Sequence, residues 1–196
     1  MSVSAVSPLA QTGRAPAPVA LATPRWTIDA SHSHVGFAVR HLMISNVRGE
    51  FTKLEGAAGY DPARPEATTV DVSIDVASVN TREEKRDAHL RSADFFDVEN
   101  YPTMRFVSTS ARERGENLEL KGGLTIHGVT REVTLKVADI TPQSKDPWGK
   151  LRVGATASTK IRRSDFGMQW NAALETGGVV VGDEVTITLE VELVKE

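Results

Sequence analysis

Apolar and polar residues alternate along most of the chain, which is the pattern of extended strands that bury one face and expose the other to water. The C-terminal segment shows this most clearly, because every second residue from Val185 to Leu193 is apolar and the intervening residues are threonine or glutamate. The same alternation occurs at residues 35–39, 70–76 and 133–137. The pattern therefore predicts amphipathic β-strands at these positions.

Turn-forming residues separate the predicted strands. Clusters rich in Gly, Pro, Asn and Asp occur at residues 61–65, 114–117, 142–149 and 177–183, and such clusters end one strand and reverse the chain. About eight strands joined in this way form an antiparallel meander, and closure into a barrel leaves no long edge strand exposed. We therefore predict an all-β fold, an extended eight-stranded antiparallel up-and-down β-barrel.

The interior of such a barrel is either filled by its own side chains or holds one small ligand. The apolar face of residues 151–161 is small in the middle of the strand, and Gly49, Gly56 and Ala58 add small residues on neighbouring strands. These residues either leave room for a ligand or accommodate large neighbours such as Phe37. The pattern alone does not choose between a cavity and a filled core.

One highly charged segment interrupts the strands. Thr81 is followed three residues later by Glu84, which is the spacing of a capping box, and predicts a short helix that runs to Leu90 or Arg91. The segment has little apolar content, so the helix cannot belong to the core. We expect it in a crossover at the surface, as a lid over a barrel opening, with apolar residues such as Phe95 pinning the connection.

Composition limits the functional classes. The 196 residues fit one domain plus a tail. The net charge of -3, with basic and acidic residues interspersed, does not favour a nucleic-acid partner. The absence of cysteine excludes disulfides, thiolate metal sites and a cysteine nucleophile. No apolar run approaches the roughly 20 residues of a membrane span, so we expect a soluble protein without membrane insertion.

The N-terminal segment differs from the remainder of the chain. Residues 1–24 contain four prolines among Ala, Ser and Thr and begin without basic residues. This composition predicts a disordered leader rather than a secretory signal, followed by one domain at residues 25–196. We therefore expect a cytoplasmic location, and the alternative is an unrecognised targeting peptide that leads to export.

Histidines are the main candidates for metal binding. His32 and His34 stand two residues apart, which would place both imidazoles on the same face of a strand. A zinc site needs three or four ligands, and no second cluster with suitable spacing follows. We therefore expect no metal or other cofactor. His41 continues the inward parity of residues 35–39, and would mark the polar end of a cavity or be a histidine capped by carbonyl groups at the rim.

Motifs for covalent catalysis are missing from the sequence. The chain has neither a G-x-S-x-G nucleophile elbow nor a glycine-rich phosphate loop. Asp183 and Glu184 fall in a predicted turn, where solvated charges are common. Arg162 and Arg163 are interpreted as a solvated strand end, although one of them could meet a diphosphate or phenolic head group. We therefore predict that the protein is not an enzyme.

Five segments resemble, in order and spacing, the YceI-like, lipocalin-like polyisoprenoid-binding family. They are WTIDASHSHVGFAVRHLMISNVRGEF, RDAHLRSADFFDVENYPTMRF, GGLTIHGVTREVTL, DPWGKLR and RSDFGMQW. The resemblance covers nearly all of residues 25–195. The resemblance implies a lipocalin-like barrel that holds a polyisoprenoid chain or a related long amphiphile. It assigns no catalytic role to any residue of this chain. Family members form dimers and many are exported, and the leader of this chain does not follow the export pattern.

From the pattern and the resemblance together, we predict a carrier that binds a long-chain isoprenoid or fatty-acid-like lipid for transport, storage or protection, and that forms a homodimer. The alternatives are a metal-dependent enzyme that uses His32 and His34, and a ligand-free structural or interaction barrel. The predicted ligand-binding residues are Val35, Phe37, Val39, His41, Phe51, Val72, Ile74, Leu90, Phe95, Met104, Phe106, Leu135, Val153, Phe166, Ile187 and Leu189.

Overall fold

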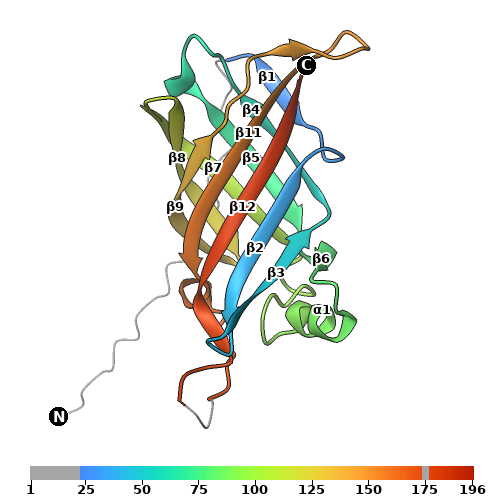
Figure 1. Cartoon of the computed structure of the whole chain (residues 1–196), viewed down its shortest axis with the longest axis vertical. Helices are drawn as coiled ribbons and strands as arrows, with labels where there is room; N and C mark the ends of the chain where they lie inside the picture. The colour runs from blue at the N-terminus through green and yellow to red at the C-terminus, as the bar shows by residue number, and fades with distance from the viewer. Residues whose placement is uncertain (1–22, 174–176) are drawn as a thin grey trace, which may run out of the picture.

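The computed structural model describes residues 23–173 and 177–196 and shows a tall antiparallel barrel with one α-helix beside its lower end (Figure 1). The helix is α1 (Glu84–Arg91), and three short 3-10 turns are η1 (Pro65–Ala67), η2 (Val76–Ser78) and η3 (Arg163–Phe166). The strands are β1 (Arg25–Ile28), β2 (His34–His41), β3 (Ser45–Phe51), β4 (Leu54–Gly59), β5 (Thr69–Asp75), β6 (Val79–Asn80), β7 (Thr103–Arg114), β8 (Asn117–Ile126), β9 (Val129–Ala138), β10 (Ser144–Lys145), β11 (Leu151–Arg162) and β12 (Val181–Lys195).

The strands form one closed sheet. Several short strands share one position in the barrel. Strands β1 and β2 both pair with β12, β4 pairs with β1 while β3 pairs with β2, and β6 follows β5 and pairs with β3. Pairing of β11 with β12, from Arg152–Val194 to Arg162–Glu184, closes the ring. The result is a closed eight-stranded antiparallel barrel with one helix, which confirms the predicted fold class.

The alternating pattern determines which residues face the interior. Val35 is opposite Leu189 and Phe37 is opposite Ile187 in the pairing of β2 with β12. Because side chains on a strand alternate between faces, this register places the apolar residues of both strands on the same side of the sheet. The threonine and glutamate residues between them face outward, and the buried core lies along the barrel axis.

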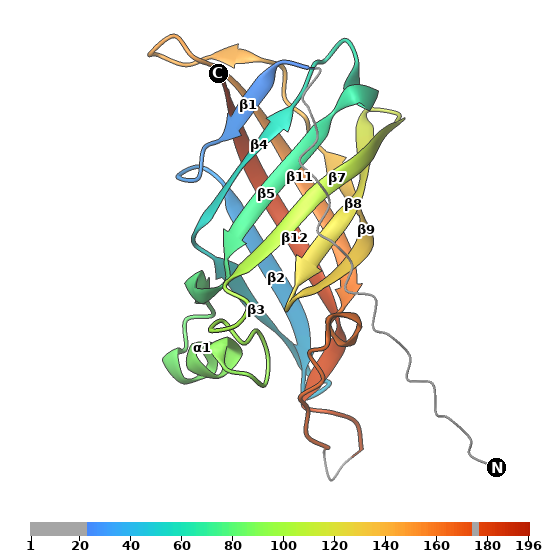
Figure 2. The ribbon, with the colours of Figure 1, turned by 180° about the vertical axis from the view of Figure 1, so that it is seen from behind.

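The barrel wall is incomplete on one side of its lower end. Strand β4 pairs with β5 along Leu54–Gly59, but β3 is accompanied on this side only by β6, opposite Glu50 and Phe51. The chain then leaves the wall, forms α1, and returns at Thr103 to pair with β5. The crossover of residues 81–102 therefore lies beside the unpaired part of β3 (Figure 2).

Helix α1 lies in the predicted crossover and ends where predicted, but the predicted capping box is wrong. The N-cap is Glu83, whose carboxylate accepts two backbone N–H groups of the first turn, at 3.2 and 2.6 Å. Thr81 instead donates its backbone N–H to the buried Asp87 carboxylate at 2.9 Å. Arg82 has a φ of 62°, which turns the chain between Thr81 and the helix. Thr81 therefore takes no part in the N-cap, and Glu84 is simply the first residue of the helix.

The predicted leader falls mainly outside the described residues, since residues 1–22 are not described. Thr23 is buried, and the carbonyl of Pro24 accepts the backbone N–H of Tyr60 at 3.0 Å. Contacts of the described chain with the barrel therefore begin at Thr23, two positions before the predicted domain boundary. Among the described residues, no helix has the length and apolar character needed to cross a bilayer.

Candidate ligand-binding site

A narrow cavity of about 240 Å³ runs inside the barrel. Its lining includes Val181 near one end of β12 and Leu193 near the other, which are roughly 40 Å apart along an extended strand. The volume lies just below the roughly 300–1,000 Å³ of typical ligand pockets. A small volume distributed over this length describes a channel, which fits one extended chain better than a compact molecule.

All but two of the predicted ligand-binding residues line this cavity. They are Val35, Phe37, Val39, Phe51, Val72, Ile74, Leu90, Phe95, Met104, Phe106, Leu135, Val153, Ile187 and Leu189. They come from strands all round the barrel and from the crossover. Strand alternation therefore located the cavity wall, and their contact with a ligand stays a prediction.

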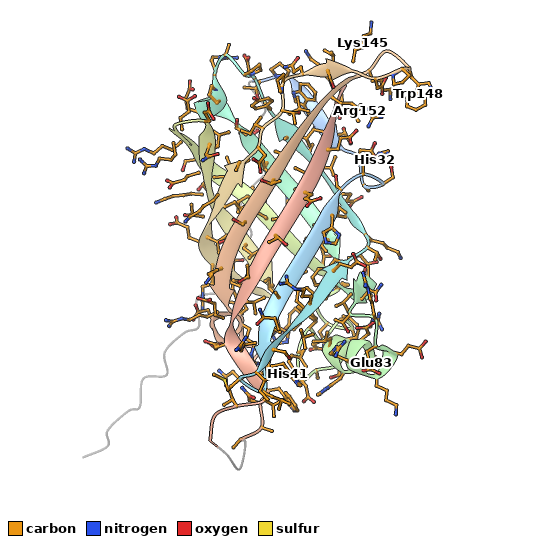
Figure 3. All side chains as sticks on the ribbon, in the orientation of Figure 1. His32, His41, Glu83, Lys145, Trp148 and Arg152 are labelled. Atoms are coloured by element: carbon orange, nitrogen blue, oxygen red, sulfur yellow. The ribbon has the colours of Figure 1, made fainter. Side chains whose placement is uncertain are left out.

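His41 and Phe166 do not line the cavity. His41 stands at the end of β2, where it pairs with Ser45 and Val181 (Figure 3), and it does not line the cavity although Val181 does. Phe166 is 1% exposed and packs in the hydrophobic core. It belongs to the 3-10 turn η3, where the two-residue periodicity of strands no longer applies.

Other lining residues were not predicted individually. They include Ile28, Ala57, Phe96, Leu118, Leu120, Leu124, Ile126, Val137 and Met168. Leu118 and Leu120 alternate with polar residues in the sequence, so strand periodicity could have identified them. Met168 follows η3, and no local pattern indicates that this loop folds back over the barrel end.

Small residues on β11 provide the space for the cavity. Ala155, Ala157 and Thr159 all line it. Gly49 and Gly56 have a different role, because a side chain at either position would collide with a neighbouring residue. Both interpretations of the small residues therefore hold, but on different strands.

The crossover covers the lower end of the cavity with aromatic residues. Phe96 packs edge-on against Phe51 of β3, with ring centroids 5.7 Å apart. The ring centroid of Trp170 is 5.3 Å from that of Phe95 and 4.8 Å from that of His89. These contacts join the crossover both to the barrel wall and to the loop that follows η3, in the position expected for a lid.

Polar contacts hold α1 against the barrel. The Arg91 Nη2 donates to the carbonyl of Val79 at 2.8 Å, and Arg86 Nε donates to the Thr81 hydroxyl at 2.7 Å. Asp87 is buried beside Thr81. The helix therefore depends on a few specific hydrogen bonds for its position, since Leu90 is its main apolar contact with the core.

Arg163 is buried at the lower end of the barrel, where it bonds to backbone carbonyls. Its guanidinium donates to Gly182 at 2.9 Å, to Met168 at 2.8 Å and to Trp170 at 2.9 Å. Burial lowers the pKa of Arg163. Because its donors bind the loop after η3 to the start of β12, Arg163 closes the barrel end, and its neighbour Arg162 is exposed.

Few polar side chains border the cavity. The Thr68 hydroxyl is buried without a hydrogen-bond partner among the described residues. Burial raises the pKa of Tyr60. The Arg105 guanidinium donates from Nη2 to Asp71 Oδ2 at 2.6 Å. No nucleophile paired with a base occurs in the described lining. The site is suited to hold an apolar chain by burial.

His32 and His34 do not form a convergent pair. His32 lies in the turn before β2 rather than on the strand, and its Nδ1 is 3.0 Å from Asp29 Oδ2. The hydrogen bond that His32 donates to the Asp29 carboxylate raises the pKa of His32. His34 instead faces β3, with Nδ1 3.2 Å from Glu50 Oε2. The strand geometry assumed for a shared metal site is therefore wrong.

Near the upper end of the barrel, a second group of side chains carries atoms of the kind that bind metals, but the Arg152 guanidinium already lies among them. Asp29, His32 and Glu192 place ligand atoms within 4.8 Å of one another. Arg152 Nη1 donates to Asp29 at 2.7 Å and to Glu192 at 2.5 Å, and Arg152 Nε donates to Asp146 at 2.8 Å (Figure 3). Hydrogen bonds from Ser31 and Arg152 hold the pKa of Asp29 well below its usual range. The arginine thus neutralises the carboxylates that a metal would require.

Known proteins resemble this chain in both sequence and fold. Protein YceI of Salmonella newport is 38% identical over 168 residues, which cover 86% of this chain and 84% of that protein. The structure of BcnA from Burkholderia cenocepacia is similar, with a TM-score of 0.74 and 25% identity, covering 84% of this chain and 98% of the other.

A third protein shares the fold at lower identity. It is described as a polyisoprenoid-binding domain from Saccharophagus degradans, with a TM-score of 0.63 and 17% identity, covering 87% of this chain and 98% of that one. Residues 26–193 match the family described as the YceI-like domain. The match begins in β1 and ends two residues before the end of β12, so nearly the whole barrel is included, and the chain belongs to the YceI-like family.

Proposed function

We propose that the protein binds a long-chain polyisoprenoid or a related amphiphilic lipid inside the barrel, for transport, storage or protection. The observation that carries this proposal is the long, narrow cavity with an almost wholly apolar wall. Burial contributes about 0.8 kcal/mol per CH₂, so one isoprene unit brings about 4 kcal/mol. A few units reach the ceiling of non-covalent affinity, so a bound chain should be retained.

Two further observations support a carrier rather than an enzyme. The described lining brings no nucleophile together with a base, and Arg152 neutralises the cluster of potential metal ligands found among the described residues. The Saccharophagus degradans domain that shares this fold is described as polyisoprenoid-binding. The ligand contacts that we propose are the predicted residues that line the cavity, with the small residues of β11 providing the width.

A test of this proposal uses the width of the cavity at Ala157. Ala157 lines the cavity, whereas the adjacent Ser158 has the opposite strand parity and faces outward. The protein, stripped of lipid by organic extraction and refolded, is titrated with a fluorescent long-chain polyene. We expect saturable binding that Ala157→Phe weakens by about tenfold or more, while Ser158→Phe changes it by less than about twofold.

The same titration can contradict the proposal. Absence of saturable binding by the refolded wild-type protein, with its circular dichroism spectrum restored, would show that the cavity does not take a long chain. Equal binding by Ala157→Phe and Ser158→Phe would show that the probe binds the outer surface. Thermal denaturation of both variants checks that each retains the barrel.

A further inference from the structure

The lower end of the barrel carries an exposed apolar tip, which we define as Leu42, Met43, Ile44 and Val179. Their exposed fractions are 37%, 54%, 76% and 37%. Leu42, Met43 and Ile44 connect β2 to β3, whereas Val179 precedes β12, and the Leu42 N–H donates to the carbonyl of Val180 at 2.8 Å. Two segments far apart in the sequence therefore build one apolar surface outside the cavity.

The backbone of the apolar tip is in a conformation that its side chains disfavour. Leu42 and Met43 have φ values of 51° and 60°, and the Ile44 N–H donates to the His41 carbonyl at 3.0 Å. Positive φ at both central residues is the signature of a type I′ turn, which favours Asn-Gly. Large apolar side chains at these positions are strained and also exposed to water. Met43 lies against Gly178, but the turn stays largely exposed, and such backbone outliers often occur at functional positions.

Basic residues stand directly behind the apolar tip. Arg40 on β2 and Arg48 on β3 are exposed on the outer face, and residues 40–48 contain no carboxylate. The Arg40 Nη2 donates to the carbonyl of Met43 at 3.1 Å, which holds it beside the turn. Apolar side chains followed by arginines are the arrangement that enters a membrane interface, where arginine reaches the phosphate groups.

The shape of the tip favours a lipid surface over a protein. A stable protein interface buries roughly 1,000 Å² or more, and three apolar residues of one turn, with Val179 beside them, offer a much smaller contact. A bilayer can deform around so small a patch, because its lipids are fluid. Figure 1 shows the turn between β2 and β3 at the lower end of the barrel, the end at which α1 lies and opposite to the C-terminus, with the described part of the loop that precedes β12 extending beyond it.

We propose that the apolar tip docks on the surface of an anionic phospholipid bilayer, with Met43 and Ile44 in the boundary between head groups and acyl chains and with Arg40 and Arg48 at the phosphates. The lower end of the barrel, with its crossover, then faces the membrane. This inference does not depend on what the cavity holds, so its test and the test of lipid binding can fail separately.

One experiment reports the orientation on the membrane. The chain has no cysteine, so Met43→Cys provides a single site for an environment-sensitive fluorophore. The matched control is Trp148→Cys, because Trp148 is 82% exposed and lies at the opposite end of the barrel (Figure 3). With vesicles of phosphatidylcholine containing about one quarter phosphatidylglycerol, we expect a blue shift and stronger emission at position 43 only. No change at either position, or a shift at 148 alone, would overturn the proposal.

A second experiment separates docking from a structural role. The double change Leu42→Asn and Met43→Gly installs the residues that the turn prefers, so thermal stability should stay the same or rise. We expect this variant to lose co-sedimentation with the same vesicles, whereas Trp148→Ser retains it and the pair Arg40→Gln and Arg48→Gln weakens it. Wild-type sedimentation by the Asn-Gly variant would overturn the proposal. A smaller solution mass of that variant without vesicles would also overturn it, because the tip would then join two copies of the chain.

Discussion

Phe37 lies directly against Gly49, its partner across the β2–β3 pair. A Cβ atom placed at Gly49 would be 2.7 Å from Phe37 Cε1 and closer still to Cζ. Phe37 also lines the cavity. The missing side chain at Gly49 therefore gives the Phe37 ring its place along the wall, so this glycine affects the cavity through its neighbour.

Replacement of Gly49 by alanine should force the Phe37 ring to move. We expect Gly49→Ala to lower the free energy of unfolding by about 1–3 kcal/mol, and Phe37→Leu in the same chain to recover part of the loss. Chemical denaturation measures both changes. The control is Gly154→Ala on β11, where the nearest heavy atom would be at an ordinary distance of 3.4 Å. Equal stability of the two alanine variants would contradict this account of Gly49.

The N-cap of α1 gives a prediction that differs from the sequence pattern. Glu83→Ala removes the carboxylate that accepts two N–H groups of the first turn, and should destabilise the helix by about 1 kcal/mol. Glu84→Ala removes the residue of the supposed capping box and should have little effect. Hydrogen exchange of residues 84–91 measures the difference. Faster exchange in Glu84→Ala than in Glu83→Ala would show that Glu84 stabilises the helix start more than Glu83, as the predicted capping box requires.

The lowered pKa of Asp29 predicts how acid affects stability. A carboxylate whose pKa is lower in the folded state stabilises the fold above its unfolded pKa of about 3.9, and this contribution is lost as the pH falls below that value. Asp29→Asn should therefore be less stable than the wild type at pH 7, and the two should converge in acid. Urea unfolding at neutral and acidic pH tests this. Parallel stability curves would show that Asp29 does not contribute in this way.

Arg152 should control whether the upper cluster binds a metal. We expect the wild-type protein to bind no stoichiometric Zn²⁺ in calorimetry, because the guanidinium already bridges Asp29 and Glu192. Arg152→Met removes this cation and should create Zn²⁺ affinity that His32→Ala abolishes and His34→Ala leaves unchanged. Stoichiometric binding by the wild type would favour the metal-dependent alternative.

The barrel could be predicted from the sequence because strand alternation and turns are local signals. The parity of Val35, Phe37 and Val39 is sufficient to assign their face, and each lines the cavity. The same parity failed for His41, although its partner Val181 lines the cavity. The register between β2 and β12 shifts between Val181 and Val185, so the regular alternation that assigns a face does not extend to the end of this strand pair.

The side-chain contacts of Asp29 could not be predicted from strand periodicity. The side chain of Asp29 accepts the backbone N–H of Ser31 at 3.1 Å, and this turn removes His32 from the strand that the spacing suggested. Arg152 joins Asp29 and Glu192 from opposite ends of the chain, which no local pattern encodes. The cytoplasmic location and the homodimer stay predictions, since nothing in the barrel geometry tests them.

Native mass spectrometry of freshly purified protein tests the central claim most directly, because it weighs the protein together with whatever the cavity retains. The account predicts a complex heavier than the chain by the mass of one long-chain lipid, which collisional activation releases intact and which Ala157→Phe reduces relative to Ser158→Phe. A spectrum that contains only the mass of the chain, from protein never exposed to detergent or solvent, would contradict the claim that this barrel carries a lipid.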